Sequence, residues 1–294
     1  MLKHYPNSYH DQLNIAKLIM KEDSTALNKL SNTHKTNKYL IYFVIGGDPN
    51  YKQLLQFAIN SIKSFPQNQN IDITVICENG YQANLEELRD INVLALPPMK
   101  HPSLLKTQIF HHPHLHEYNK VLFLDCDIVV FGSLQPIFDT IKQTDCLYVV
   151  PEGPYPKFRD KPHECPHHHR VDRPYTQSEI NLFTEKGIKT FNAGQFGFSV
   201  SKTICSLFQK VASDLVDYNR EIHIYEQPFM NDVFNRNLAV NYDLGKFVRI
   251  VWAGRKEPLT NINVITHFVD ASSPWQNKLE AMRKYWHQNI KTNN

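Results

Sequence analysis

The sequence predicts an α/β protein with a mostly parallel central sheet that is flanked by helices. Two observations indicate this class. From about Lys38 onward, apolar runs of strand length alternate with segments of helix length, and the run VLFLDCDIVVF at 121–131 reads as a fully buried strand. Parallel strands need crossovers long enough to hold a helix, and such sheets are covered on both faces. We therefore expect one α/β domain over residues 38–294.

The expected elements follow one another along the chain. Residues 1–37 are polar with one amphipathic candidate, and we interpret them as an appended N-terminal helical extension. Strands are then expected at YLIYFVIG, IDITVICE, NVLALP and KVLFLDCDIVVF, with helices at LLQFAINSIKSF, ANLEELRD and LLKTQIFHH between them. A Pro- and His-rich stretch at 151–177 has no apolar period and predicts a long loop. Periodic structure returns with FNAGQFGFSVSK, a helix over 201–219, a second helix near EQPFMNDVFNRN and a closing strand at NVITHFVD.

Composition narrows the class of protein. The chain is 41% hydrophobic and 21% charged, as ordinary globular proteins are, and its formal net charge of +3 is too small to indicate nucleic-acid binding. Its five cysteines are odd in number and several lie in apolar runs, which favours reduced core thiols. The sequence shows no signal peptide and no transmembrane segment. We expect a cytoplasmic protein, with export by a specialised machinery left open.

Asp125 and Asp127 interrupt the buried run, where an unpaired carboxylate would cost several kcal/mol. Side chains two positions apart on a strand face the same way, and ligands of parallel sheets bind beyond the carboxyl ends of the strands. Two carboxylates that face one point there suit a divalent cation such as Mg²⁺ or Mn²⁺, which prefers oxygen ligands and often bridges a diphosphate.

Two other interpretations of the aspartate pair stay open from the residues alone. In the first, one aspartate caps the following turn and the other pairs with a Lys or Arg. In the second, the chain is a phosphatase of the haloacid-dehalogenase class, in which a DxD motif supplies an aspartate nucleophile. That class carries the motif on the first strand of its domain, whereas about three strand and helix pairs precede it here.

Several stretches occur in a characteristic order: GGDPNYKQLLQFAINSI, LLKTQIF, EYNKVLFLDCDIVVFGSL, YVVPEGPYP, FNAGQFGFSVSK, YEQPFMNDVF and ITHFVDASSPW. Together they span most of residues 38–286 and resemble the family 8 retaining glycosyltransferases, the glycogenin and bacterial galactosyltransferase type of the GT-A fold. The resemblance implies a metal-dependent retaining transfer of a sugar from a nucleotide sugar, most often UDP-linked. It also implies Mn²⁺ or Mg²⁺ as cofactor and a carbohydrate, protein or other hydroxyl acceptor.

The resemblance assigns a role to each site residue. A neutral imidazole can complete a metal site that two carboxylates begin, so the implied metal ligands are Asp125, Asp127 and His267. The implied nucleotide and donor-binding residues are Asp48, Asn50, Tyr51, Lys106 and Gly194. The residues implied around the transferred sugar are Glu152, Asn192, Glu226 and Gln227, with Glu226 and Gln227 nearest the reactive carbon. Whether a nucleophile or only charge stabilisation acts there stays open.

The sequence departs from the family pattern at four positions. Asp270 stands in place of the glycine and Ser273 in place of the lysine of the terminal HxxGxxKPW motif, while Glu152 replaces an aspartate and Pro228 a second one. The missing lysine removes a cation that the resemblance places at the diphosphate. It motivates an alternative in which the chain is a non-catalytic module that binds nucleotide sugars without turnover.

Two histidine clusters, HHPHLH at 111–116 and HECPHHH at 163–169, contain residues that can bind Zn²⁺. Their spacing fits no closed zinc-site template. We interpret them as solvated loops that face the acceptor.

Overall fold

The computed structural model describes residues 38–99, 102–152, 170, 172–218, 226–252, 263–269 and 274–290. Four of the sequence predictions fall on residues outside this part of the chain. They concern the N-terminal extension at 1–37, most of the Pro- and His-rich loop including its second histidine cluster, Asp270, and Ser273.

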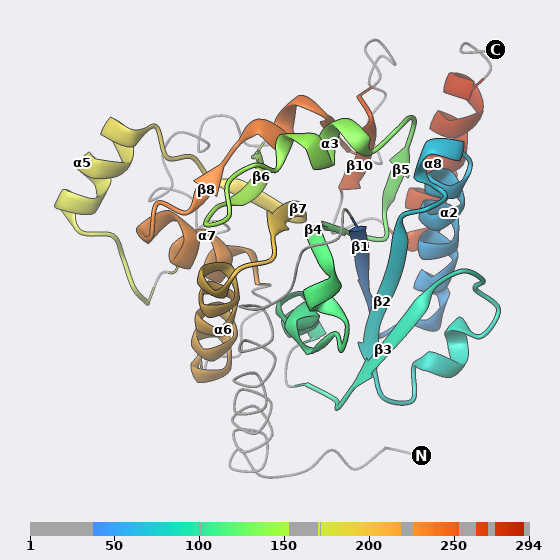
Figure 1. The fold of residues 1–294 in the computed structure, drawn as a ribbon, viewed down its shortest axis with the longest axis horizontal. Coiled ribbons are helices and arrows are strands. Elements are labelled where there is room, and N and C mark those ends of the chain that lie inside the picture. The colour runs from blue at the N-terminus through green and yellow to red at the C-terminus, as the bar shows by residue number, and fades with distance from the viewer. Residues whose placement is uncertain are drawn as a thin grey trace.

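The central sheet contains, within the described residues, β1 (Lys38–Ile45), β2 (Asp72–Glu78), β3 (Asn92–Leu96), β4 (Tyr118–Leu124), β6 (Leu147–Pro151), β7 (Phe191–Ser199) and β8 (Val240–Asn241). Their spatial order is β3-β2-β1-β4-β7-β6-β8 (Figure 1). β7 is antiparallel to β4 and β6, and the other neighbouring pairs are parallel. The sheet is therefore mostly parallel, as the sequence predicts.

Helices cover both faces of this sheet (Figure 1). The α-helices α6 (Lys202–Asp217) and α7 (Gln227–Arg236) and the 3₁₀ helix η4 (Pro102–His111) pack on one face, and α2 (Lys52–Lys63) and α3 (Gln135–Thr140) pack on the other. Alternation along β1 explains the two layers: Leu40 and Tyr42 enter the first core, and Ile41 and Phe43 enter the second. A strand buried on both faces reads as a continuous apolar run, which is why β1 and β4 were predictable.

A second, smaller sheet adjoins the first at the end of β4. It consists, in the described part of the chain, of β5 (Ile128–Val130), β10 (Ile265–Val269) and β9 (Val248–Trp252) in the order β5-β10-β9. α8 (Trp275–Ile290) packs on it beside α2 (Figure 1), through a core that includes Leu54, Phe268 and Met282. The prediction of a single strand through 120–131 is therefore wrong. The chain leaves the central sheet after Leu124 and enters the small sheet at Ile128, because each half finds its own hydrogen-bonding partners.

Several other elements differ from the sequence prediction. The segment 83–90 forms only one 3₁₀ turn, η3 (Gln82–Leu85), because Leu85 is its one fully buried side chain and too little apolar surface supports a longer helix. η4 is a 3₁₀ helix where an α-helix was expected. α3, α5 (Gln177–Lys186), α8, β6, β8 and β9 were not predicted. α5 begins with a capping box in which Thr176 and Glu179 bond each other's backbone amides.

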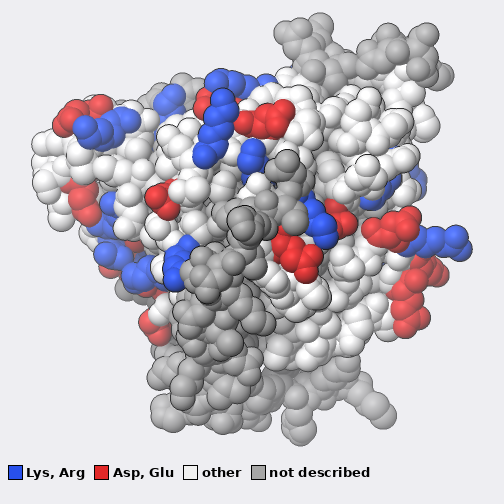
Figure 2. Space-filling model, viewed as in Figure 1, with Lys and Arg blue, Asp and Glu red and all other residues white. Residues whose placement is uncertain are grey.

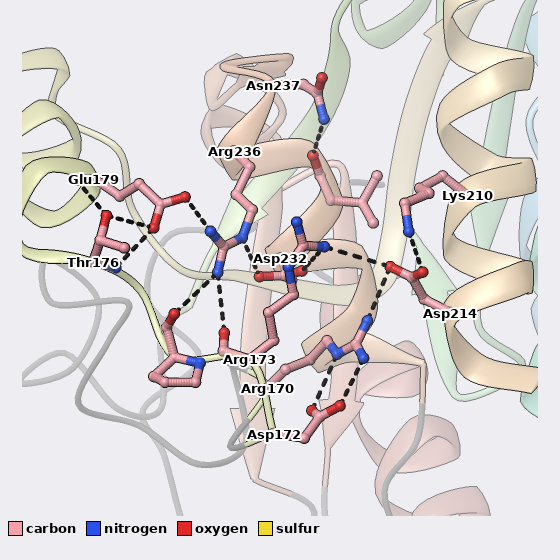
Figure 3. Close-up of polar contacts among 12 residues, drawn as sticks. Arg170, Asp172, Arg173, Thr176, Glu179, Lys210, Asp214, Asp232, Arg236 and Asn237 are labelled. Carbon is pink, nitrogen blue, oxygen red and sulfur yellow. Dashed lines mark hydrogen bonds and ion pairs between the residues drawn. The ribbon is translucent and has the colours of Figure 1, made fainter. Parts of the chain in front are cut away.

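Charged side chains of both signs lie beside one another on the face shown in Figure 2, in keeping with the small net charge. One group of them forms a network between α5, α6 and α7 (Figure 3). Arg236 pairs with Asp232 at 2.7 Å and with Glu179, while Arg170 pairs with Asp214 at 2.9 Å. Because Asp232 is fully buried, its charge depends on these partners. The network therefore connects the segment before α5 to α7.

Candidate active site

Asp125, Asp127 and His267 meet at one point, although the histidine is 140 positions beyond Asp127. Nε2 of His267 lies 3.1 Å from Oδ1 of Asp127 and 3.8 Å from Oδ2 of Asp125. Within the described residues these three form the group of side chains placed to hold a metal, with one ligand atom from each lying within 4.8 Å of the others. Two carboxylates and an imidazole suit Mn²⁺ or Mg²⁺. These distances show that Nε2 is the ring nitrogen that faces the aspartates, and Nδ1 of the buried ring has no hydrogen-bond partner among the described residues.

The meeting of the two sheets explains this convergence. Asp125 follows the carboxyl end of β4 in the central sheet, and Asp127 precedes β5 in the small sheet. His267 lies on β10 opposite Ile128, and the amide of Phe268 donates to the carbonyl of Asp127 at 2.9 Å. The antiparallel register therefore holds the imidazole beside the aspartates.

Gly194 forms one wall of the metal group. Its carbonyl accepts a hydrogen bond from the amide of Asp125 at 2.7 Å. A methyl carbon placed on it would lie 2.4 Å from Cε1 of His267, 2.7 Å from Oδ1 of Asn192 and 2.8 Å from Oδ2 of Asp125. Glycine is required here because the backbone approaches the site too closely for any side chain.

Lys106 is buried beside the aspartates. Its Nζ lies 3.0 Å from Oδ1 of Asp125 and 2.5 Å from Oε1 of Glu226, and it donates to the carbonyl of Ala193 at 3.3 Å. Burial alone would lower the pKa of this ammonium, but Asp125 and Glu226 outweigh burial and hold the pKa above its usual range. Lys106 therefore stays charged and links the aspartate pair to the start of α7.

Glu226 and Gln227 lie on the same side of the site as Lys106. Glu226 precedes α7, is 3% exposed and uses its carboxylate to bind Lys106. Gln227 is the first residue of α7, and its Oε1 accepts from the amide of Ala193 at 2.9 Å. Asn192 bonds the amide of Gly194 at 2.8 Å. Both side chains therefore hold the start of β7 (Phe191–Ser199), the strand that carries Gly194.

The residues assigned to the nucleotide lie after β1. Asp48 caps the 3₁₀ turn η1 (Pro49–Tyr51) and accepts from the backbone and the side-chain amide of Asn50, each at 2.9 Å. Tyr51 is 39% exposed and lines a cavity of about 200 Å³ together with Asp125 and Asp127. Tyr51 thus offers an exposed ring next to the metal group, whereas Asp48 and Asn50 bond each other and do not line the cavity.

Glu152 is positioned by its backbone. It follows β6, is 2% exposed, and its amide donates to the carbonyl of Thr190 at 3.0 Å. This contact holds it beside the start of β7, the strand that carries Asn192 and Gly194.

The two aspartates differ in their electrostatic surroundings. Burial raises the pKa of Asp125, and although Lys106 opposes this, Asp127 adds to it. Burial would also raise the pKa of Asp127, but Lys278 and His267 outweigh burial and hold it well below the usual range. Asp127 is therefore the more acidic of the two carboxylates, and a divalent cation would favour the ionised form of both.

Lys278 is a site residue that the sequence analysis missed. Its Nζ lies 2.6 Å from Oδ2 of Asp127, and both side chains are 14% exposed. It occupies the first turn of α8, where the helix dipole disfavours a cation. No sequence signal pointed to it, because α8 was not predicted and its partner Asp127 is 151 positions away.

The first histidine cluster lies elsewhere. It precedes β4, whereas the aspartates follow that strand, so the prediction that this cluster faces the acceptor side is wrong. His112 is buried and lines a cavity of about 430 Å³ with Thr74 and Tyr118. His112 and His114 belong to no metal-type group of three within the described ranges.

Sequence comparison identifies the family to which this chain belongs. The profile described as "Glycosyl transferase family 8" matches residues 97–279, which is more than half of the chain. The chain therefore belongs to glycosyltransferase family 8. This assignment overturns the phosphatase alternative. A search of curated proteins gives no match.

Solved structures share the fold. LgtC, a galactosyltransferase in complex with donor and acceptor sugar analogues, is 18% identical with a TM-score of 0.57, over 86% of this chain and 95% of LgtC. The apo form of the glycosyltransferase GlyE of Streptococcus pneumoniae TIGR4 is 15% identical with a TM-score of 0.53, over 87% and 64% of the two chains. The apo bifunctional glycosyltransferase WbbM is 16% identical with a TM-score of 0.53, over 88% of this chain and 52% of the WbbM chain. At these identities the likeness confirms the predicted fold class.

No helix in the described part of the chain combines the length and the apolar character needed to cross a bilayer.

Proposed function

We propose that the protein is a metal-dependent retaining glycosyltransferase that takes a sugar from a UDP-linked donor and transfers it to a hydroxyl acceptor. The observation that carries the proposal is the convergence of Asp125, Asp127 and His267 on one point beside a cavity. Their donor set fits Mn²⁺ or Mg²⁺, and Gly194 leaves the site free of a side chain that would crowd it. When bound, the ion supplies Lewis-acid chemistry at the leaving diphosphate.

The chain's own residues would bind and orient the donor. Tyr51 lines the cavity and is exposed, and the base of the donor would stack on its ring. Lys106 brings a permanent positive charge to the side of Asp125 that faces α7. Retention requires the acceptor hydroxyl to approach the face from which the diphosphate leaves, so the enzyme must hold both on one side.

Glu226 and Gln227 would lie at the reactive sugar carbon. Glu226 is paired with Lys106 at 2.5 Å, which makes its carboxylate a weaker nucleophile and favours a role in holding the lysine. Gln227 is uncharged, and its Oε1 is held by the amide of Ala193. The second lone pair of that oxygen would stabilise a positively charged sugar in the transition state.

The test is metal-dependent hydrolysis and binding of nucleotide sugars. Purified protein is incubated with a panel of UDP-sugars with and without Mn²⁺, and release of UDP is followed. Slow release that requires Mn²⁺ supports the enzyme, whereas Mn²⁺-dependent binding without any release favours the non-catalytic module.

Asp127→Asn is the decisive variant for the metal role. The change keeps the shape of the side chain and removes the charge that an ion needs, so Mn²⁺-dependent UDP binding should disappear while the circular dichroism spectrum stays the same. If Asp127→Asn retains full Mn²⁺-dependent turnover, the assignment is wrong.

A further inference from the structure

Lys278 occupies a position that is unfavourable for a cation, and it is held there by Asp127. It lies in the first turn of α8, near the positive end of the helix dipole, and its Nζ is 2.6 Å from Oδ2 of Asp127. The position is rigid, because Leu279 and Met282 of the same helix are buried in the core of the small sheet. The lysine therefore reaches the metal group from a helix that is anchored in the core.

The two aspartates each have a lysine, but the lysines are not equivalent. Lys106 binds Asp125 and also has Glu226 and the carbonyl of Ala193 as partners. Among the described residues, Lys278 forms its ion pair and its hydrogen bond with Asp127. If a divalent ion takes both carboxylates, Lys106 keeps its other partners. Lys278 would be left as a largely buried, unpaired cation, which is unfavourable.

The donor supplies the missing anion. Asp125, Asp127 and His267 would hold the ion, so a donor diphosphate that binds to it would lie beside Asp127. The cavity next to Asp127 is also lined by Tyr51, on whose exposed ring the base of the proposed donor would stack. An ammonium that leaves the carboxylate of Asp127 is therefore already at the edge of the space that the diphosphate enters.

We propose that Lys278 is an exchangeable counter-ion that neutralises Asp127 before the metal binds and pairs with the donor diphosphate afterwards. This inference rests on the proposed function. It assigns to α8 the diphosphate-binding cation that Ser273 does not provide. It also makes metal and donor binding cooperative, because the ion alone must displace Lys278 without giving it a new partner.

The proposal predicts two effects of opposite sign. Lys278→Met removes the competitor for Asp127, so Mn²⁺ alone should bind about threefold to tenfold more tightly. The same change removes a charged contact to phosphate, so UDP at saturating Mn²⁺ should bind about tenfold more weakly. A lysine that only stabilises the fold would leave UDP affinity at saturating Mn²⁺ unchanged.

Isothermal titration of Mn²⁺ alone, and of UDP at saturating Mn²⁺, measures both effects on the full chain. Lys284→Met is the matched control, because Lys284 is an exposed lysine on the same helix and its loss changes the net charge equally. It should alter both affinities by less than about twofold. Lys278→Arg should keep UDP affinity within about threefold, since a guanidinium also binds phosphate.

The outcomes distinguish failure of the proposed metal site from failure of the counter-ion role of Lys278. If the wild type binds no Mn²⁺, the proposed metal site fails and the counter-ion role fails with it. If the wild type binds Mn²⁺ and UDP, but Lys278→Met leaves UDP affinity unchanged or weakens Mn²⁺ alone, only the counter-ion role is overturned. Should Lys278→Met unfold in buffer, Mn²⁺ must restore its thermal transition, because the ion replaces the lost counter-ion; failure to restore it also overturns the proposal.

Discussion

The close approach of Gly194 to the metal group leads to a quantitative prediction for Gly194→Ala. The added methyl carbon would lie 2.4 Å from Cε1 of His267, whereas carbon atoms normally approach to about 3.5 Å. The two groups must therefore separate by about 1 Å. The same methyl would lie 2.8 Å from Oδ2 of Asp125, so the movement cannot be directed toward the carboxylate.

A movement of this size is large for a metal site. Ligand distances tolerate changes of about 0.2 Å, and disturbing even the residues behind the ligands costs about 10- to 100-fold in metal affinity. We expect Gly194→Ala to weaken Mn²⁺ binding at least about 100-fold and to lower the free energy of unfolding by about 1–3 kcal/mol through overpacking.

Isothermal titration of Mn²⁺ and urea unfolding in the presence of a chelator measure these two quantities separately. Gly132→Ala is the control, because a methyl carbon there meets no atom within 4 Å and its φ is not positive. It should leave Mn²⁺ affinity unchanged. An unchanged Mn²⁺ dissociation constant in Gly194→Ala would refute the reasoning, since the ligands would not then be where the structure places them.

Two further variants test the site and the fold. Gln227→Ala should slow turnover by at least about tenfold while changing UDP affinity by less than about threefold, because its proposed contact is to the reacting centre; equal losses in steady-state kinetics and UDP titration would move Gln227 to the nucleotide pocket. Burial, and then His114, lower the pKa of His112, whose Nδ1 accepts from the amide of His114 at 3.3 Å. The unfolded chain therefore binds the proton more readily, and stability should fall as the pH drops below about 6.5. Urea unfolding at pH 7 and pH 5 should show a smaller loss in His112→Asn than in the wild type, and an equal loss would contradict the assignment.

The order of elements in the first half of the chain could be predicted because β1 and β4 are buried on both faces and read as apolar runs. The break between β4 and β5 could not be predicted in the same way. Both halves are apolar, and only their partners differ: β4 pairs with β1 and β7, whereas β5 pairs with β10 from the end of the chain. Pairing over such distances leaves no local pattern. The same reason hid β9, whose partner β10 also lies beyond a long connection.

Site residues within a family motif could be predicted from the sequence, whereas those outside any motif could not. The resemblance could indicate Asp125, Asp127 and His267 because their residue types and order match a family pattern, and the structure brings them together. Lys278 could not be found because its partner Asp127 is 151 positions away and no motif includes it. A single lysine on a helix is usually solvated. Lys106 is instead buried, beside Asp125 and Glu226, which come from other parts of the chain.

The position of the metal group at the junction of the two sheets has an energetic consequence. Asp125 belongs to the central sheet, while Asp127, His267 and Lys278 are held by β5, β10 and α8 of the smaller unit. An ion that bonds to both sides binds only when the two sheets are docked. At 100 times its dissociation constant it therefore adds about 2.7 kcal/mol to the stability of the docked state. Mn²⁺ should accordingly protect the amides of β10 from hydrogen exchange more than those of β2, which pairs entirely within the central sheet.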